Sequence, residues 1–317
     1  MDKRKIWLTG SSGLAGRAIL ARLAEQKIDV LSVTNQTAAN YPEKDEATAL
    51  GFKSRQYVDF SQAGQIEDSC SRFGVPEILI HSGWGGISEP ESQIHLNENV
   101  ADSLTLIRTL YRLGLKKFVF LGTINEYGQR TGRLSEEMEP VGKLRNYEAG
   151  KRKVGELGIK EAEEQGAIYI HVRVANLFGA PQRVNSLIST LHQAYNSNES
   201  AQLSECGNYR DYIHTSDVAE GILRICDIKS STTVNLGSGT SILLRDFVET
   251  YWESLGGDRD KLIFGSLQQR KDEHEQPRAF MDISKLAELT HWKPASTLQE
   301  GIKQTVIDMN SYWRRLG

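Results

Sequence analysis

The sequence alternates short apolar runs with longer segments of helical periodicity, and this order constrains the fold more than any other feature. The runs with strand character cover residues 5–9, 29–34, 78–81, 117–122, 167–174 and 232–236. Helical periodicity marks the segments 15–26, 93–113 and 147–165. Such alternation is typical of a parallel sheet covered by helices on both faces. We therefore predict an α/β chain with a doubly wound parallel sheet.

The pattern loosens after about residue 177, where polar stretches such as 196–201 and 268–276 separate the apolar runs. Loops of this kind are typical of a region that covers a ligand cleft. We expect residues 1–176 to form the sheet domain and residues 177–317 to form mainly a smaller, substrate-binding region. The apolar run at 232–236 is expected to return to the sheet.

Composition excludes several classes of protein. With 38 Lys and Arg against 41 Asp and Glu, the formal net charge of −3 gives no electrostatic footprint for a nucleic acid. The three cysteines, Cys70, Cys206 and Cys226, are too few and too scattered for a disulfide framework or a zinc cluster. No stretch reaches the roughly 18 apolar residues of a membrane helix. We expect a cytoplasmic protein with no nucleic-acid or membrane partner and no metal site.

A glycine-rich turn at residues 10–16 follows the first expected strand and opens the first expected helix. Glycines at this spacing allow a tight turn, close approach of a pyrophosphate and close helix–strand packing. The helix N-terminus would hold the phosphates through its N–H groups and dipole. A helix-entry turn with small residues for packing is the simpler alternative. The placement predicts a Rossmann-type, NAD(P)-binding sheet domain with cofactor contacts from Gly10, Ser12, Gly13, Leu14 and Gly16.

The end of the second strand carries neither an acid nor an arginine, because Asn35 stands in the segment 33–37. A carboxylate there would bind the ribose 2′-hydroxyl of NAD, and its loss removes repulsion against a 2′-phosphate. We therefore favour NADP(H), with Asn35 at the cofactor and Arg17 or Lys44 as helpers, while NAD remains an alternative. Asp59 lies where a third strand would end, either at the adenine edge or as a turn carboxylate.

Tyr147 and Lys151 stand four residues apart, on one face of the third expected helix. A lysine ammonium near the phenol is expected to lower the pKa of Tyr147 towards the working pH. Such a tyrosine can move a proton to or from a sugar hydroxyl or ketone. Thr123 follows an apolar strand, where its hydroxyl would face the ligand crevice and share the same substrate oxygen. We predict Thr123, Tyr147 and Lys151 as catalytic residues, the last two also touching the cofactor.

With these motifs the chain resembles the extended short-chain dehydrogenase/reductases of the NAD-dependent epimerase/dehydratase group, which act on nucleotide sugars. The resemblance runs nearly from end to end. Besides the glycine turn and the Thr123, Tyr147 and Lys151 set, its segments are 81–84, 97–100, 174–179, 210–214, 217–219, 235–239, 277–278, 282 and 292–294.

The resemblance implies roles for further residues. Asn99 matches an asparagine that supports the catalytic lysine through a water, and Asn176 matches a substrate-binding asparagine. Arg210 and Arg278 match positions that bind the nucleotide diphosphate. Without the resemblance, Arg210 would be interpreted as an exposed surface charge. Trp84 and Glu126 are also placed at the substrate. Segments 93–113 and 147–165 are those that pair in family homodimers, so we expect a homodimer.

The segment after Thr123 separates reactions within the family. The 4,6-dehydratases carry an Asp-Glu pair there, whereas this chain has Ile124 and Asn125. Glu126 precedes Tyr127 and Gly128, as in reductases of 4-keto-6-deoxysugars. We therefore predict an NAD(P)-dependent reductase of a nucleotide-diphosphate-linked 4-keto-6-deoxysugar, with Tyr147 as proton donor. A C-4 epimerase with bound NAD is the alternative from the same residues, and a non-catalytic NAD(P)-sensing protein is the alternative from another class.

Overall fold

The computed structural model describes residues 4–35, 55–268 and 278–316, and its centre is a seven-stranded sheet whose neighbouring strands are all parallel. The strand order is β12-β7-β5-β4-β1-β2-β3. The strands are β1 (Lys5–Thr9), β2 (Asp29–Thr34), β3 (Arg55–Tyr57), β4 (Ile78–His81), β5 (Lys117–Leu121), β7 (Ile168–Val174) and β12 (Thr232–Leu236). This arrangement confirms the predicted Rossmann-type α/β fold.

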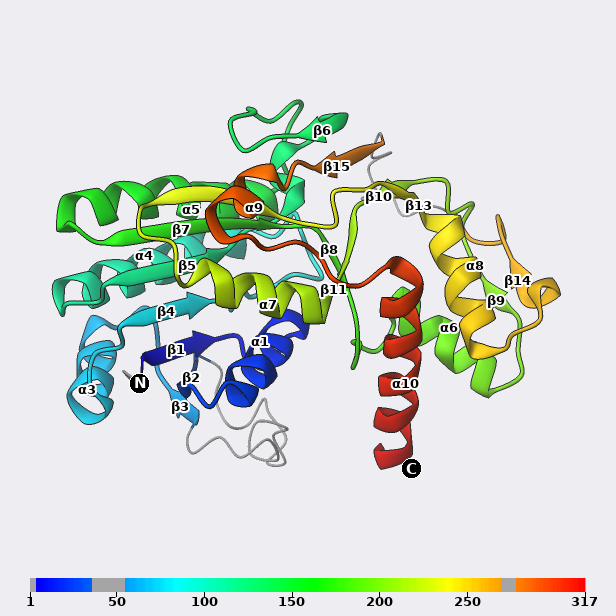
Figure 1. Cartoon of the computed structure of the whole chain (residues 1–317), viewed down its shortest axis with the longest axis horizontal. Coiled ribbons are helices and arrows are strands. Elements are labelled where there is room, and N and C mark those ends of the chain that lie inside the picture. The colour runs from blue at the N-terminus through cyan, green and yellow to red at the C-terminus, as the bar shows by residue number, and fades with distance from the viewer. Residues whose placement is uncertain (1–3, 36–54, 269–277, 317) are drawn as a thin grey trace.

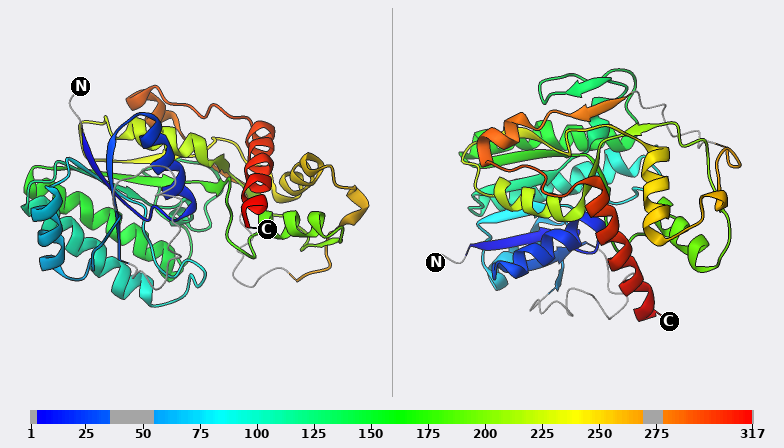
Figure 2. Two further views of the ribbon diagram at one scale, coloured as in Figure 1. Left: turned by 90° about the horizontal axis from the view of Figure 1, so that it is seen from below. Right: turned by 45° about the vertical axis from the view of Figure 1, so that its right-hand side comes forward.

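Helices cover both faces of the sheet, as Figures 1 and 2 show. One layer contains α1 (Leu14–Glu25), α7 (Thr215–Ile225) and α9 (Ser284–Thr290). The other contains α3 (Ala63–Phe73), α4 (Ile94–Arg112) and α5 (Asn146–Gln165), with α4 and α5 packed side by side. The strands are apolar on both faces because both faces are covered.

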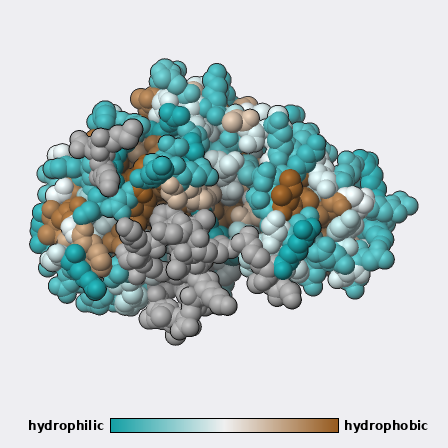
Figure 3. Space-filling view, turned by 60° about the horizontal axis from the view of Figure 1, so that its bottom comes forward, coloured by the Kyte–Doolittle hydropathy of each residue, from teal (hydrophilic) through white to brown (hydrophobic). Residues whose placement is uncertain are grey.

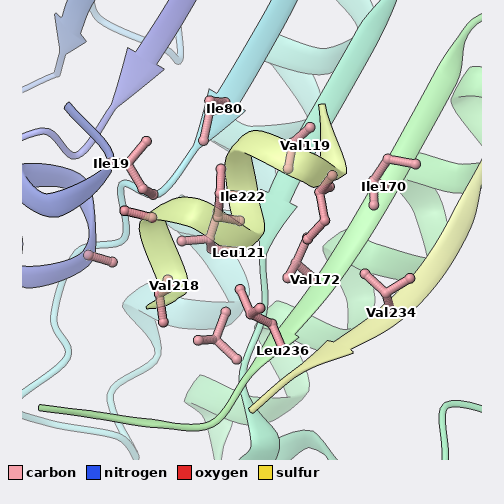
Figure 4. Close-up of a cluster of buried hydrophobic side chains, with 14 of the residues drawn as sticks. Ile19, Ile80, Val119, Leu121, Ile170, Val172, Val218, Ile222, Val234 and Leu236 are labelled. Carbon is pink, nitrogen blue, oxygen red and sulfur yellow. The ribbon is translucent and has the colours of Figure 1, made fainter. Parts of the chain in front are cut away.

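Successive side chains along a strand point to opposite faces of the sheet, so each strand contributes to the hydrophobic layer on both faces. Val119 and Leu121 of β5 point towards α7, where they meet Val218 and Ile222 in the cluster drawn in Figure 4. Phe118 and its alternate neighbours face the α3–α4–α5 layer instead. The period of two along a strand therefore builds one hydrophobic layer on each face.

The smaller C-terminal part has a hydrophobic core of its own, built around Phe178, Leu191, Phe247, Trp252 and Ile302. Its helices are α6 (Leu187–Asn196), α8 (Leu244–Leu255) and α10 (Leu298–Leu316), and Figure 1 shows them beside the sheet. Not every residue after 177 belongs to this smaller C-terminal part. Helix α7 packs against the large sheet, and β12 is one of the strands of that sheet.

Four short strand pairs lie outside the large sheet in the described residues. Parallel pairs are β8 (Asn176–Phe178) with β11 (Tyr212–His214), β6 (Gly132–Leu134) with β15 (Ala279–Met281) and β9 (Ala201–Gln202) with β14 (Leu262–Ile263). The pair β10 (Tyr209–Arg210) with β13 (Ile242–Leu243) is antiparallel. In the ranges that the structure describes, the 3₁₀ turns are η2 (Ile124–Tyr127) and η3 (Arg259–Lys261).

The surface and the helices give two further observations. Within the described ranges, no helix is long and apolar enough to cross a membrane. On the face in Figure 3, hydrophobic residues gather in separate patches among hydrophilic ones rather than in a continuous band.

Candidate active site

The glycine turn after β1 has the shape that a pyrophosphate requires. Gly10 has φ 68°, and a Cβ there would lie 2.5 Å from the backbone nitrogen of Gly83. A Cβ at Gly16 would lie 2.0 Å from the carbonyl oxygen of Gly10, so both positions require glycine. Gly13 is exposed, meets nothing closer than 3.4 Å, and gives the first turn of α1 no side-chain cap. The residues present therefore fit a dinucleotide phosphate at this helix N-terminus.

The other residues predicted to bind the cofactor differ in their exposure and in their hydrogen bonds. Asn35 is exposed directly after β2, while Lys44 lies outside the described residues. Arg17 donates to the carbonyl oxygens of Ser12 at 2.9 Å and Pro181 at 2.5 Å, so it ties the glycine turn to the C-terminal part. Asp59 accepts the N–H of Ser61 at 3.0 Å. This hydrogen bond fits one of its two predicted roles, that of a turn carboxylate.

Thr123 and Tyr147 meet at the carboxyl edge of the sheet. Thr123 follows β5 and caps η2, where its Oγ1 accepts the N–H of Asn125 at 3.3 Å. Tyr147 lies in the first turn of α5, and its backbone N–H donates to the carbonyl of Pro90 at 2.9 Å. The Thr123 hydroxyl lies close enough to the phenol to act on its pKa. The structure therefore brings both predicted hydroxyl groups to one point.

Lys151 lies below this pair in an aromatic pocket. Its Nζ donates to the carbonyl of Leu121 at 2.6 Å and lies 4.8 Å from the ring centroid of Trp84 and 5.2 Å from that of Phe120. Burial lowers the pKa of Lys151 to about 8, with the Glu126 charge acting in the opposite direction. The ammonium is therefore held close to its titration range.

The predicted direction of the pKa shift of Tyr147 was wrong. Lys151 was expected to lower it, but burial and then the charges of Glu126 and Glu148 raise it above its ordinary value, while the nearby Thr123 side chain acts in the opposite direction. The main physical reason is burial of the phenol, which opposes its ionisation, and two carboxylates act in the same direction; the Lys151 ammonium is directed to the Leu121 carbonyl instead. Tyr147 is therefore protonated at neutral pH.

Trp84 lies beside the tyrosine and is held by a histidine that sequence reasoning missed. The indole Nε1–H donates to Nδ1 of His95 at 3.0 Å, and the two rings are stacked at 9°. His95 is fully buried, and its other nitrogen contacts the carbonyl of Glu89 at 3.0 Å. The amide of Asn99 donates to Gly85 at 3.0 Å, which holds the same loop. Its water-mediated support of the lysine stays a prediction.

A buried chain of hydrogen bonds lies behind this loop. The N–H of Gly83 donates to Thr9 Oγ1 at 3.1 Å, which bonds His81 Nδ1 at 2.7 Å. His81 Nε2 bonds the hydroxyl of Ser103 at 3.1 Å, and this hydroxyl donates to the carbonyl of Asn99 at 2.7 Å. Ser103 therefore accepts from Nε2–H, and Nδ1 accepts from Thr9. Burial and then the Lys151 charge lower the pKa of His81 to about 3.

Glu126, which was predicted to lie at the substrate, has a carboxylate that is enclosed by other groups of the protein. The residue is 0% exposed, and its oxygens accept the N–H of Thr123 at 2.8 Å, Nε2 of His171 at 3.1 Å and Nε of Arg173 at 3.2 Å. Burial opposes its ionisation, yet these partners hold the pKa of Glu126 below its ordinary value. A carboxylate can be buried in this way only when its charge is paired and hydrogen-bonded.

Two glycines make room for this cluster. A Cβ at Gly122 would lie 2.4 Å from Oε1 of Glu126, and one at Gly155 would lie 2.2 Å from Nδ1 of His171. His171 and Arg173 were missed by sequence reasoning. The available signal was the presence of an imidazole and a guanidinium in the otherwise apolar run 167–174, since buried polar groups need partners.

The predicted substrate residues gather where the short strand pairs meet. Arg210 ends β10, and the guanidinium of Arg278 lies 5.5 Å from the ring centroid of the preceding residue, Tyr209. Asn176 begins β8 and is half-buried, with its side-chain amide donating to the carbonyl of Asp211 at 3.1 Å. The structure thus places the two arginines at one junction and Asn176 next to it.

Asp211 anchors that junction and was not singled out from the sequence. Its fully buried carboxylate accepts the backbone N–H and the hydroxyl of Ser238 at 2.8 and 2.7 Å, and the N–H groups of Met281 at 3.0 Å and Gly239 at 3.3 Å. Burial nevertheless raises the pKa of Asp211. These bonds join β10 and β11 to the segments after β12 and in β15.

A parallel sheet with a glycine turn and a tyrosine–lysine pair at its carboxyl edge defines a dinucleotide-binding α/β enzyme. The sequence profile of the NAD dependent epimerase/dehydratase family matches residues 6–237. The chain belongs to this family, the extended short-chain dehydrogenase/reductases that modify nucleotide sugars. The predicted family and enzyme class are confirmed.

Relatives of different activity resemble the chain to a similar degree. GDP-L-fucose synthase 1 of Arabidopsis thaliana is 26% identical over 95% of this chain and 91% of its own. The dTDP-4-dehydro-6-deoxyglucose reductase of Escherichia coli is 23% identical over 96% of this chain and 98% of its own. Among solved structures, UDP-glucose 4-epimerase of Thermotoga maritima with UDP-glucose has a TM-score of 0.84 at 21% identity and covers 98% of this chain and 99% of that one.

Proposed function

We propose that the protein is an NAD(P)-dependent reductase of a nucleotide-diphosphate-linked 4-keto-6-deoxysugar. The observation that carries this proposal is the position of a protonated Tyr147 beside Thr123, with the buried Lys151 Nζ 5.7 Å from the centroid of its ring. Bound nicotinamide would supply the hydride for the carbonyl carbon. Tyr147 donates its proton to the carbonyl oxygen, so that the ketone becomes an alcohol, and Thr123 hydrogen-bonds the same oxygen.

The raised pKa of Tyr147 suits the first step of ketone reduction. Ketone reduction begins with a phenol that can give a proton, and the raised pKa of Tyr147 maintains that form. An epimerase begins by oxidising a hydroxyl group, which needs a base instead. Dehydration has no support in η2, where Ile124 is buried and Asn125 is an amide.

Other parts of the proposal concern binding. Arg278, whose guanidinium lies beside the Tyr209 ring, and Arg210, the next residue of β10, are suited to a diphosphate because a guanidinium forms paired charge-assisted hydrogen bonds. The exposed Asn35 after β2 places no carboxylate against a 2′-phosphate, which favours NADP(H). We also propose a homodimer through α4 and α5.

The test is the absorbance of NADPH after mixing with protein and a panel of nucleotide 4-keto-6-deoxysugars. Stoichiometric loss of absorbance with one nucleotide is the expected result. Tyr147→Phe should lower kcat by about 10²–10⁴-fold. Tyr195→Phe, at a partly exposed tyrosine of α6, is the matched control.

Two outcomes would overturn the proposal. If NADPH is not consumed but the protein interconverts nucleotide hexoses without added cofactor, the protein is an epimerase. If Tyr147→Phe leaves all measured chemistry unchanged, the tyrosine is not the proton donor and a cofactor-sensing role gains support.

A further inference from the structure

Three aromatic rings surround the buried ammonium of Lys151. Its Nζ lies over the rings of Trp84, Phe120 and Tyr147, at 4.8, 5.2 and 5.7 Å from their centroids. Within the described residues, the hydrogen-bond acceptor of Nζ is the carbonyl of Leu121, at 2.6 Å. The face of an aromatic ring attracts a cation at such distances, and most strongly where water is excluded. The rings therefore stabilise the charged form of this lysine.

The largest of these rings, the Trp84 indole, is held at its edge by His95. The indole Nε1–H donates to Nδ1 of His95 at 3.0 Å, and the two rings are stacked at 9°. The other nitrogen, Nε2, lies 3.0 Å from the carbonyl oxygen of Glu89, which can only accept a hydrogen bond. These partners assign the proton of His95 to Nε2 and leave Nδ1 as an acceptor. The imidazole is therefore neutral and has one tautomer.

The backbone of α5 lies directly against this stacked pair. Gly150 is the residue before Lys151, and a Cβ there would lie 2.5 Å from the carbonyl oxygen of His95 and 3.2 Å from Cζ2 of Trp84. A glycine is thus needed for the helix turn that carries the lysine to approach the indole and the imidazole. The close contact fixes the indole under the ammonium.

Few groups around Lys151 can supply a compensating charge. Burial disfavours its ammonium, and the charge of Glu126 in η2 favours it. That carboxylate is already paired with an imidazole and a guanidinium. Of the other titratable neighbours, His81 of β4 has a pKa of about 3, Tyr147 of α5 has a raised pKa, and His95 of α4 is an acceptor. All three are therefore neutral near pH 8, and the ring faces add attraction without adding an anion.

We propose that Trp84 and His95 are positioning residues for Lys151: the indole face stabilises the ammonium, and His95 holds the indole in place. The inference rests on the proposed function, since it concerns the charge of the lysine during that reaction. An ammonium beside Tyr147 favours the phenolate that remains after the phenol has given its proton. Loss of the positive charge should therefore lower kcat.

The test follows the titration of Lys151 itself, without substrate or nucleotide. The protein is labelled with ¹³C at Cε of lysine, and Lys151→Met identifies the NMR signal. Trp84→Phe and Trp84→Leu introduce side chains of similar size, so water that enters the space affects both, and the difference between them reports the ring face. The midpoint for Trp84→Phe should lie about 0.5–1.5 pH units above that for Trp84→Leu, the size of a cation–π contact.

The matched control is Trp313→Leu. Trp313 also stacks on a histidine, since its ring centroid lies 6.0 Å from that of His192, but it belongs to α10. This variant should keep the wild-type midpoint of Lys151.

The role of His95 is tested by a second pair of variants. His95→Asn places an amide oxygen near the position of Nδ1 and retains an acceptor, whereas His95→Leu removes it. The indole N–H resonance of Trp84, identified by its loss in Trp84→Phe, should stay downfield in His95→Asn and move in His95→Leu. The Lys151 midpoint should also be lower in His95→Leu than in His95→Asn.

Equal Lys151 midpoints in folded Trp84→Phe and Trp84→Leu would overturn the role of the indole face, and equal behaviour of the two His95 variants would overturn that of His95. Thermal unfolding shows which variants fold. If the Trp84 variants do not fold, the midpoints of the His95 pair decide both roles. If the midpoints differ as expected but no nucleotide ketosugar consumes NADPH, the proposed reduction fails while the positioning roles stand.

Discussion

The carboxylate of Glu126 accepts the backbone N–H of Thr123 at 2.8 Å from a position with no solvent exposure. One buried anion thereby fixes the residue whose hydroxyl meets Tyr147. The same charge favours the ammonium form of Lys151 and opposes ionisation of Tyr147. Glu126 is a positioning residue that also sets the electrostatics of both groups.

Replacing Glu126 by Gln should therefore shift the pH dependence of the reaction. Without the anion the pKa of Lys151 falls further below about 8, so the alkaline fall in kcat should begin at lower pH. Stability should decrease by about 3–5 kcal/mol, because His171 and Arg173 lose a buried partner. A pH profile of kcat and urea unfolding measure the two effects. An alkaline limb at the wild-type pH would contradict the electrostatic role.

The wild-type enzyme should itself lose activity as the pH rises past about 8. Above this value Lys151 releases its proton, whereas the raised pKa of Tyr147 keeps the phenol protonated. The expected result is an apparent pKa near 8 in the profile of kcat. Lys153→Met, at an exposed lysine of the same helix, should leave that limb unchanged. A limb near pH 10.4, the ordinary range of a lysine, would show that burial does not act on Lys151.

Gly155→Ala should destabilise the protein by about 1–3 kcal/mol because its Cβ would meet the His171 ring at 2.2 Å. Gly64→Ala provides the matched control, since this glycine also lies in a helix and its Cβ would meet nothing within 4 Å. There the change should be neutral or stabilising by about 0.5–1 kcal/mol. Urea unfolding compares them, and equal changes would show that the ring can move aside.

Much of the fold could be predicted because its signals are local. The strands over 5–9, 29–34, 78–81 and 232–236 begin and end as expected, since each is a short run with strand character between turns. The expected helices differ by one residue at one or both ends. For the strand Arg55–Tyr57 only the approximate end was predicted from the sequence, because three residues carry little periodicity.

The residues of the candidate site also differ in whether local sequence features reveal them. Thr123, Tyr147 and Lys151 could be found because a strand end and a helical spacing are local features. The cluster around Glu126 could not, because His171 and Arg173 are 45 and 47 residues away and reach it only through the pairing of β5 with β7. The raised pKa of Tyr147 likewise depends on burial that spacing does not reveal.

His81 should make the protein sensitive to acid. In the folded chain its pKa is about 3, whereas an unfolded histidine titrates near about 6.5. Between these values the unfolded state binds more protons, so the free energy of unfolding falls as the pH falls, by up to about 1.4 kcal/mol per pH unit for this one group. His81→Gln should reduce the slope of stability between pH 5 and 6.5, although it lowers stability at neutral pH by disturbing the bonds to Thr9 and Ser103. Chemical unfolding at several pH values measures the slope, and His291→Asn, at an exposed histidine, is the control that should retain it. If His81→Gln keeps the full wild-type slope, His81 is not the neutral, buried link that the hydrogen-bond chain requires.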